Sequence, residues 1–469
     1  MLGTRSSSFC RNSAEKHACE QANFHRKVKK HMSFFLRGVR VPHRKNTADQ
    51  PAVTVTDVRS VTIPTVMHIG APATPVVSVG DTVQVGTLIA EGSGAFSAPI
   101  HASVSGKVTK IASILLSSGK SVPAITIESD GEMTPCESLC PPVVNSREDL
   151  LNAIRNSGTV GLGGAGFPTH VKFNVDSSRI EALIINGAEC EPYITSDSYT
   201  MTERVGDMEF ALRAIQKHYG IARIIIGIES NKKSAIAAMR ELAARLEGTE
   251  VRVLPQIYPQ GGEKVLIYHT VKRVVPTGKL PIDVGCVVCN CTTIAEIGKY
   301  LQTGMPLVSK CVTVDGGAVA EPRNLILPIG TSLEDAFNLC GGFKLSPHKV
   351  LYGGPMMGIA VPSLGVPVIK NTNAVLALCE REAKLPEATA CIRCGTCTRA
   401  CPFGLAPAEI MLAYQKKDTA LLERLSVDTC MLCGCCSFDC PANRPLVQTN
   451  NLSKQLLREE RAKEASKNG

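Results

Sequence analysis

The sequence predicts a multidomain protein that combines α/β and α+β folds. Three observations carry this prediction: a β-rich stretch at about 52–128, strands alternating with helices from about 147 to 301, and a duplicated cysteine motif near the C-terminus. With 469 residues, of which 44% are hydrophobic, the chain is long enough to bury several cores.

Composition excludes some classes of function. Aromatic residues make up only 4% of the chain and tryptophan is absent, which argues against a stacking platform for nucleic acid. The net charge of +9 fits docking on an acidic membrane surface and docking on an acidic redox partner equally well. No apolar run reaches the roughly 18 residues of a membrane span. Unpatterned cysteines outside the motif fit a reducing cytoplasm.

The cysteine motif reads C-x2-C-x2-C-x3-C-P twice, at 391–402 and 430–441. This spacing is typical of two-cluster ferredoxins, in which the fourth cysteine of each run binds the other cluster. Zinc sites favour separated C-x2-C pairs, and disulfides need an oxidising compartment. We therefore predict two [4Fe–4S] clusters, with Cys435 as a bystander. The predicted ligand sets are Cys391, Cys394, Cys397 with Cys440, and Cys430, Cys433, Cys436 with Cys401.

The β-rich stretch contains two similar pieces, at 75–86 and 98–108. It resembles the barrel-sandwich hybrid fold of biotinyl and lipoyl carriers. Those carriers present a modifiable lysine at a hairpin tip, whereas Glu91–Ile100 contains no lysine. We expect a structural or docking module.

A glycine-rich segment follows, with G-x-G-x-x-G at Gly161, Gly163 and Gly166. A Rossmann motif needs a strand before its glycines, but a helix is predicted here at 147–156. The segment can still cradle a phosphate or a flat ring through backbone N–H groups. A purely structural glycine turn is the alternative.

Predicted strands at 182–185, 223–228 and 250–254 alternate with helices at 206–218 and 232–246. This alternation indicates a parallel sheet, whose ligands bind at the carboxyl ends of the strands.

Polar segments lie just after two of these strands, at 186–191 and 258–264. Ordinary solvated carboxylates are the alternative reading of Glu189, Glu191 and Glu263. Asn290 opens a predicted helix at 293–301, and helix capping alone would explain it.

Four segments, taken in order, resemble the flavin mononucleotide site of the NADH-oxidising subunit of respiratory complex I: Gly161–Lys172, Asn186–Pro192, Gly261–Glu263 and Asn290–Thr293. A small α+β unit at 310–345 resembles the β-grasp domain of the same family. The resemblance implies FMN contacts at Gly161, Gly163, Gly164, Gly166, Lys172, Asn186, Glu189, Gly261, Glu263, Asn290 and Thr293.

The same resemblance implies that Glu191 contacts NADH, with Phe167 beside the adenine, and makes Glu189 and Glu191 the catalytic candidates. Two positions depart from the family pattern. Ala188 stands where an acid is usual, and Gly262 replaces an expected glutamate.

The whole order resembles the RnfC subunit of the Rnf (Rsx) ion-translocating ferredoxin:NAD oxidoreductase complex, and Phe34–His43 and Gly353–Gly358 also fit. This implies a peripheral subunit on the cytoplasmic side of the cell membrane. It would pass electrons between NAD(H), FMN and two [4Fe–4S] clusters, with a ferredoxin-type protein and other subunits as partners and no nucleic acid.

The runner-up is a soluble flavin/iron–sulfur cobalamin reductase, in which the hybrid domain follows the flavin part. A metal-clipped scaffold protein is a third, non-enzymatic possibility. The domains we predict are a disordered extension at 1–32, a hybrid-like domain at 33–140, an FMN/NADH-binding α/β domain at 145–305, a β-grasp domain at 308–360, a linker at 361–385, a ferredoxin-like domain at 386–450 and a charged, fraying helical tail at 451–469.

Overall fold

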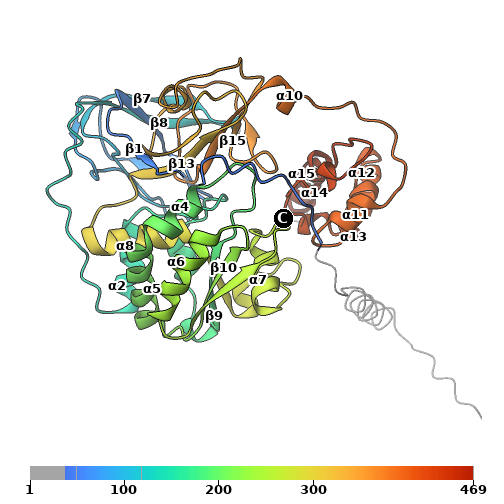
Figure 1. The fold of residues 1–469 in the computed structure, drawn as a ribbon, viewed down its shortest axis with the longest axis horizontal. Coiled ribbons are helices and arrows are strands. Elements are labelled where there is room, and N and C mark those ends of the chain that lie inside the picture. The colour runs from blue at the N-terminus through green and yellow to red at the C-terminus, as the bar shows by residue number, and fades with distance from the viewer. Residues whose placement is uncertain (1–36, 49, 118, 468–469) are drawn as a thin grey trace, which may run out of the picture. The chain divides into compact units, whose positions relative to one another are not determined.

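The computed structural model describes residues 37–467, apart from residues 49 and 118 (Figure 1). The predicted extension at 1–32 lies outside the described residues. The prediction of a multidomain mixed α/β protein is confirmed, since the described chain contains four separate sheets and a helical C-terminal part.

The β-rich stretch forms two small antiparallel sheets, which we call the hybrid unit. Their strand orders are β2-β8-β7-β4 and β3-β5-β6. Alternate residues of β2 and β8 are buried, as expected where one face of a sheet covers a core. The bounds are β2 Ser60–Pro64, β3 Thr74–Pro75, β4 Thr82–Val83, β5 Leu88–Glu91, β6 Ile100–His101, β7 Gly106–Leu115 and β8 Ser121–Ser129.

One short strand leaves this unit. We expected residues from 52 onward to belong to the β-rich domain, but β1 (Val53–Thr54) pairs in parallel with β14 (Arg323–Pro328) of another sheet. The two units also bury their apolar side chains in one hydrophobic cluster, which joins Ile63 and Ile127 to Leu327 and Phe337.

The alternating stretch forms a four-stranded parallel sheet in the order β11-β10-β9-β12, which with its helices we call the α/β unit. Most predicted helices and strands lie within two residues of their predicted ends, but β12, α3, α4 and α7 were not predicted. The bounds are α2 Arg147–Asn156, α3 Thr169–Phe173, β9 Ala182–Gly187, α4 Ser196–Glu203, α5 Val205–Tyr219, β10 Ile224–Glu229, α6 Lys233–Ala244, β11 Thr249–Leu254, α7 Glu263–Val271, β12 Cys286–Asn290 and α8 Cys291–Thr303.

Helices cover both faces of this sheet. Leu183 and Ile185 of β9 pack into one cluster with α2, α5 and α8, which lie side by side in Figure 1, while Ile184 packs with Leu266 of α7. Strands buried on both faces read as continuous apolar runs, which is why β9 and β10 were predictable. A capping box begins α2, since the Ser146 hydroxyl accepts from the Asp149 amide at 3.1 Å and the Asp149 carboxylate accepts from the Ser146 amide at 2.9 Å.

A six-stranded sheet follows, in the order β1-β14-β13-β17-β15-β16. Its strand β17 lies inside the predicted linker at 361–385 and is fully buried between β13 and β15, so that part of the chain is not a linker. A five-residue apolar run without alternation carries no period from which to assign it. The remaining bounds are β13 Ser309–Asp315, α9 Leu333–Asn338, β15 Lys349–Tyr352, β16 Ile359–Ala360, β17 Ala374–Leu378 and α10 Glu380–Ala383.

The cysteine motifs lie in a helical part that we call the cysteine unit. Its last helix, α15, packs on α12 and α13 and buries Leu457, so residues 451–467 are not a fraying tail. Among the described residues, no helix is both long enough and apolar enough to cross a membrane. The bounds are α11 Thr396–Ala400, α12 Pro407–Gln415, α13 Thr419–Arg424, α14 Cys435–Phe438 and α15 Leu446–Lys467.

Candidate functional site

The glycine segment forms a closed loop between α2 and α3. The Gly161 amide donates to the Phe167 carbonyl at 2.7 Å, and the Gly166 amide donates to the Gly161 carbonyl at 3.2 Å. Residues 163–165 at the tip are exposed. A Cβ added at Gly164 would meet no atom of the described residues within 4 Å. The tip therefore presents bare backbone to open space, which suits a cradle for an anion.

Two predicted residues at the start of α8 hold this loop from below. The Thr293 hydroxyl accepts from the Leu162 amide at 3.0 Å, and a Cβ at Gly163 would lie 3.1 Å from Asn290. The Asn290 side-chain oxygen caps α8 by accepting from the amides of residues 292 and 293.

The amide nitrogen of Asn290 donates to the Asp197 carboxylate at 2.8 Å, and the Thr292 hydroxyl donates to the same carboxylate at 2.7 Å. Asp197 is buried, and its burial raises its pKa above the usual range. Asp197 was not predicted as a site residue, because an aspartate in a Ser- and Thr-rich stretch reads as a helix cap or a turn.

Asn186 and Gly261 meet at the carboxyl end of β9. The Asn186 side chain donates to the Gly261 carbonyl at 2.9 Å and accepts from the Ala188 amide at 3.1 Å. A Cβ at Gly261 would lie 2.3 Å from the Ala188 carbonyl oxygen, so only glycine fits there.

Lys172 lies under the same edge of the sheet. Its ammonium donates to Glu263 at 3.1 Å and to the Val288 carbonyl at 3.0 Å. Burial lowers the pKa of Lys172, but the attraction of Glu263 outweighs that effect and the pKa is raised overall. Lys172 is therefore charged at neutral pH and adds a cation to this edge.

The two candidate catalytic carboxylates are both engaged by the protein. Glu189 is buried and accepts from the Asp197 amide at 2.7 Å and from the Ser198 hydroxyl at 3.0 Å. It therefore stabilises the first turn of α4, where a negative charge is favoured. The Lys232 ammonium lies 3.5 Å away.

Glu191 accepts from the Met356 amide at 3.0 Å, and its carboxylate lies 3.4 Å from the Tyr258 hydroxyl. Burial raises the pKa of Glu191 to about 7. A Cβ at Gly354 would lie 2.2 Å from this carboxylate, so the Gly353–Gly358 loop closes directly on it. This loop had no assigned role in the sequence, and here it lies on a predicted site residue.

Lys45 holds the chain between the two glutamates. Its ammonium donates to the carbonyl oxygens of Glu189, Glu191 and Ile194 at 3.0, 2.8 and 2.6 Å. Lys45 was not predicted as a site residue, because it stands among basic residues that read as a solvated segment.

Phe167 lies beside an aromatic residue of the hybrid unit. Its ring is 6.2 Å from the ring of Phe96, edge to face, and Phe96 is 54% exposed. The lysine-free tip at 91–100 thus lies against the glycine loop, and the Ala95 carbonyl contacts His170 at 3.1 Å.

The two cysteine motifs repeat one backbone conformation. The residue before the second cysteine and the glycine after it have positive φ in both copies, at 56° and 72° for Arg393 and Gly395 and at 60° and 82° for Leu432 and Gly434. Such left-handed residues turn successive amides toward one point and create the anion-binding nests found at many Fe–S sites.

The second motif brings its cysteines together with Cys401. Burial, followed by the charges of Cys430, Cys433 and Cys401, raises the pKa of Cys436 to about 12. This proximity is what the predicted ligand set requires. In the first motif Cys391 and Cys394 are exposed, and Cys397 is buried.

No three metal-binding side chains of the described residues converge to hold one ion. Each thiolate of a cubane binds a different iron, so its four sulfurs stand farther apart than the ligands of a single ion.

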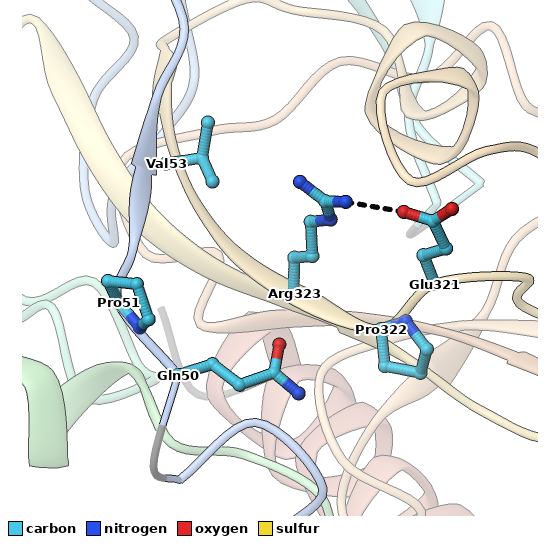
Figure 2. A pocket seen from close by; sticks show the side chains of 6 residues that line it. All are labelled: Gln50, Pro51, Val53, Glu321, Pro322 and Arg323. Carbon is cyan, nitrogen blue, oxygen red and sulfur yellow. Dashed lines mark hydrogen bonds and ion pairs between the residues drawn. The ribbon is translucent and has the colours of Figure 1, made fainter.

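A pocket of about 350 Å³ lies elsewhere, at the edge of the six-stranded sheet (Figure 2). Arg323 and Glu321 form an ion pair across its wall. None of the residues that line it was predicted to belong to the site, and the chemistry-bearing residues lie in the α/β and cysteine units instead. Its lining is Gln50, Pro51, Val53, Glu321, Pro322 and Arg323.

Four families of domain match the chain in sequence order. They are described as the RnfC barrel sandwich hybrid domain at 33–132, the Nuo51 FMN-binding domain at 154–299, the SLBB domain at 311–360 and the 4Fe-4S dicluster domain at 387–444.

Curated relatives match over most of their length. The RnfC subunit of a proton-translocating ferredoxin:NAD(+) oxidoreductase complex from Clostridium ljungdahlii is 41% identical, with 80% of this chain and 82% of the relative covered. Its counterpart in the Na(+)-translocating complex from Acetobacterium woodii is 40% identical, with 80% and 86% covered. The counterpart in an ion-translocating oxidoreductase complex from Rhodobacter capsulatus is 37% identical, with 92% and 85% covered.

Among solved structures, a chain of an NAD+-reducing [NiFe]-hydrogenase in the H2-reduced state aligns with a TM-score of 0.47 and 18% identity. The alignment covers 66% of this chain and 61% of that one, and a similarity of this size is too weak to indicate function.

An FMN-binding domain joined to a 4Fe–4S dicluster domain defines an electron-transferring oxidoreductase subunit. With relatives about 40% identical over most of their length, the chain belongs to the RnfC family, whose members are subunits of the Rnf ion-translocating oxidoreductase complexes.

Proposed function

We propose that this chain is the peripheral subunit of a membrane complex in which electrons pass between NAD(H), FMN and two [4Fe–4S] clusters, toward a ferredoxin or the membrane subunits. One observation carries the proposal. Four segments far apart in the sequence converge at one edge of the α/β unit, around a glycine tip that presents bare backbone to open space.

The chain fits FMN on this edge through groups of three kinds. Backbone amides at the tip of the Gly161–Gly166 loop suit the phosphate, and Lys172 supplies a nearby positive charge. Asn186, Gly261, Asn290 and Thr293 fix the neighbouring backbone. Bound FMN supplies the ability to accept two electrons as hydride and to release them singly.

For the nucleotide, we retain Phe167 and Glu191 as contacts. Phe167 shares an exposed aromatic surface with Phe96, which offers a flat purine a second apolar ring. Glu191 is held by Met356 and lies beside the Tyr258 hydroxyl, so a nucleotide that contacts it must displace one of them. Glu189 acts by positioning α4 beneath the site.

Each cysteine motif holds three corners of one cluster, and Cys401 and Cys440 complete the cluster of the opposite motif. The repeated left-handed turns at Gly395 and Gly434 support two equivalent clusters. Cobalamin reductase remains the second candidate in principle, but here the hybrid unit precedes the flavin unit, and the relatives share the Rnf order.

We assign the domains as predicted, with β1 moved to the six-stranded unit, β17 removed from the linker, and α15 added to the cysteine unit. The partners are the other subunits of the complex, on the cytoplasmic side of the membrane. The positive net charge supports electrostatic docking, which high salt weakens.

Anaerobic purification of the whole chain tests the proposal. We expect one FMN and about eight iron atoms per chain, with flavin and cluster absorbance bleached by NADH. Glu191→Gln retains FMN and weakens NADH-dependent ferricyanide reduction. A protein that holds zinc, or that keeps FMN but is not reduced by NADH, contradicts the metal part or the nicotinamide part respectively.

A further inference from the structure

The loop after β11 carries Tyr258, whose side chain reaches the cysteine unit. Tyr258 is 2% exposed, and its hydroxyl donates a 2.8 Å hydrogen bond to the carbonyl oxygen of Cys433. The same hydroxyl lies 3.4 Å from the Glu191 carboxylate. One buried side chain therefore joins a predicted site residue of the α/β unit to a predicted cluster ligand.

The backbone of Tyr258 is held from both sides. Its N–H and C=O groups pair with those of Val39 at 2.9 Å each, and the Cys435 thiol donates to its carbonyl at 3.7 Å. Val39, Val41, Ala400, Cys433 and Cys435 pack around the ring in one apolar cluster. Loss of the hydroxyl alone would leave this packing in place.

Two glycines show how closely the Cys430–Cys436 turn is packed. A Cβ at Gly434 would lie 2.8 Å from the Met356 carbonyl oxygen, and a Cβ at Gly262 would lie 2.5 Å from the end of the Met431 side chain. The turn is thus seated between the Met356 loop of the six-stranded unit and the α/β unit.

The first motif has a different setting. Cys391 and Cys394 are exposed, and the Cys394 carbonyl accepts from Arg399 of its own unit at 3.0 Å. Of the two equivalent carbonyls, one is therefore bound by the cysteine unit itself and the other by the α/β unit.

We propose that Tyr258 is a positioning residue for electron transfer, which seats the Cys430–Cys436 turn on the α/β unit and tunes the potential of the cluster bound there. Hydrogen bonding and solvent exposure around the ligands set the potential of a cluster. The hydroxyl both polarises the peptide of a ligand and closes one side of its turn. The inference rests on the proposed function in one respect, that both motifs bind clusters.

The test is Tyr258→Phe in the full chain, with FMN and iron content measured first. An anaerobic redox titration followed by electron paramagnetic resonance then gives the midpoint potential of each cluster. We expect unchanged FMN and iron, a shifted potential for one cluster and an unshifted potential for the other. The shift must persist when Cys394→Ser removes the first-motif cluster, and must vanish when Cys433→Ser removes the second.

Tyr300→Phe on α8 is the matched control and must leave both potentials unchanged. Should Tyr258→Phe lose iron, Met431→Ala loosens the same seat without unpairing a carbonyl, and it must shift the same cluster. Two clusters with unmoved potentials, or a shift that follows the first motif, would overturn the inference alone. A parent protein without a second-motif cluster would overturn it together with the cluster part of the proposed function.

Discussion

The ammonium of Lys45 donates a 2.8 Å hydrogen bond to the backbone carbonyl of Glu191, more than a hundred residues away in the sequence. The same ammonium pairs with the carbonyls of Glu189 and Ile194. The N-terminal segment thereby holds the loop between β9 and α4, on which both candidate catalytic carboxylates stand.

Lys45→Met should destabilise the protein by about 1–3 kcal/mol, because it leaves partly buried carbonyls without a donor while keeping an apolar stem. Thermal unfolding and FMN retention measure the effect. Lys217→Met, at an exposed position on α5, should change stability by no more than about 0.5 kcal/mol. Equal stability of the two variants would show that the three contacts hold nothing in place.

Gly164→Val should abolish FMN binding while both clusters remain, because it places a branched side chain over the open tip of the glycine loop. Flavin fluorescence after denaturation and iron analysis measure the two cofactors separately. The φ of +144° at Gly164 makes any side chain strained, so the control must share that strain.

Gly80→Val provides this control, because Gly80 also has a positive φ, of +103°, and open space around it, but lies in the hybrid unit. It should keep FMN. Loss of FMN from both variants would point to general misfolding, and retention in both would remove the loop from the flavin site.

Cys394→Ser should remove one cluster and about half of the iron, whereas Cys435→Ser should remove none. Cys435 is fully buried and donates to the Tyr258 carbonyl, so its sulfur points toward the α/β unit. Iron content and visible absorbance measure the outcome. Iron loss in Cys435→Ser, with the fold intact by circular dichroism, would make Cys435 a ligand.

Lys370 predicts a pH dependence of stability. It is buried, donates to the carbonyls of Pro99 and Gly158 at 2.6 and 2.7 Å, and burial lowers its pKa from 10.5 to about 7. Between these values the unfolded chain binds the extra proton, so the free energy of unfolding rises with pH, by at most about 1.4 kcal/mol per unit.

Lys370→Met should flatten this rise, measured as the difference in melting temperature between variant and parent from pH 7 to 8. Nearby His101 does not contribute, because burial lowers its pKa to about 3 and it stays neutral in this window. A parent and variant with parallel profiles would show that Lys370 does not change its charge on unfolding.

Local spacing in the sequence determined much of this protein. The cysteine repeat, the apolar runs of β9 and β10 and the glycine loop are short patterns whose chemistry lies within a few residues, so the mixed α/β organisation and the candidate ligands were readable from them. The resemblance of the whole order to the RnfC family was carried by the same patterns.

Only the tertiary structure decided which residues support the site. Lys45, Asp197, Tyr258 and Met356 act through partners remote in sequence, and none stands in a pattern that distinguishes it from a surface lysine, a helix cap or a core side chain. Strand β17 was missed for the same reason, because its five buried residues have no alternation and owe their structure to the two strands beside them. Contacts of this kind depend on chain closure over long distances, which local propensity does not encode.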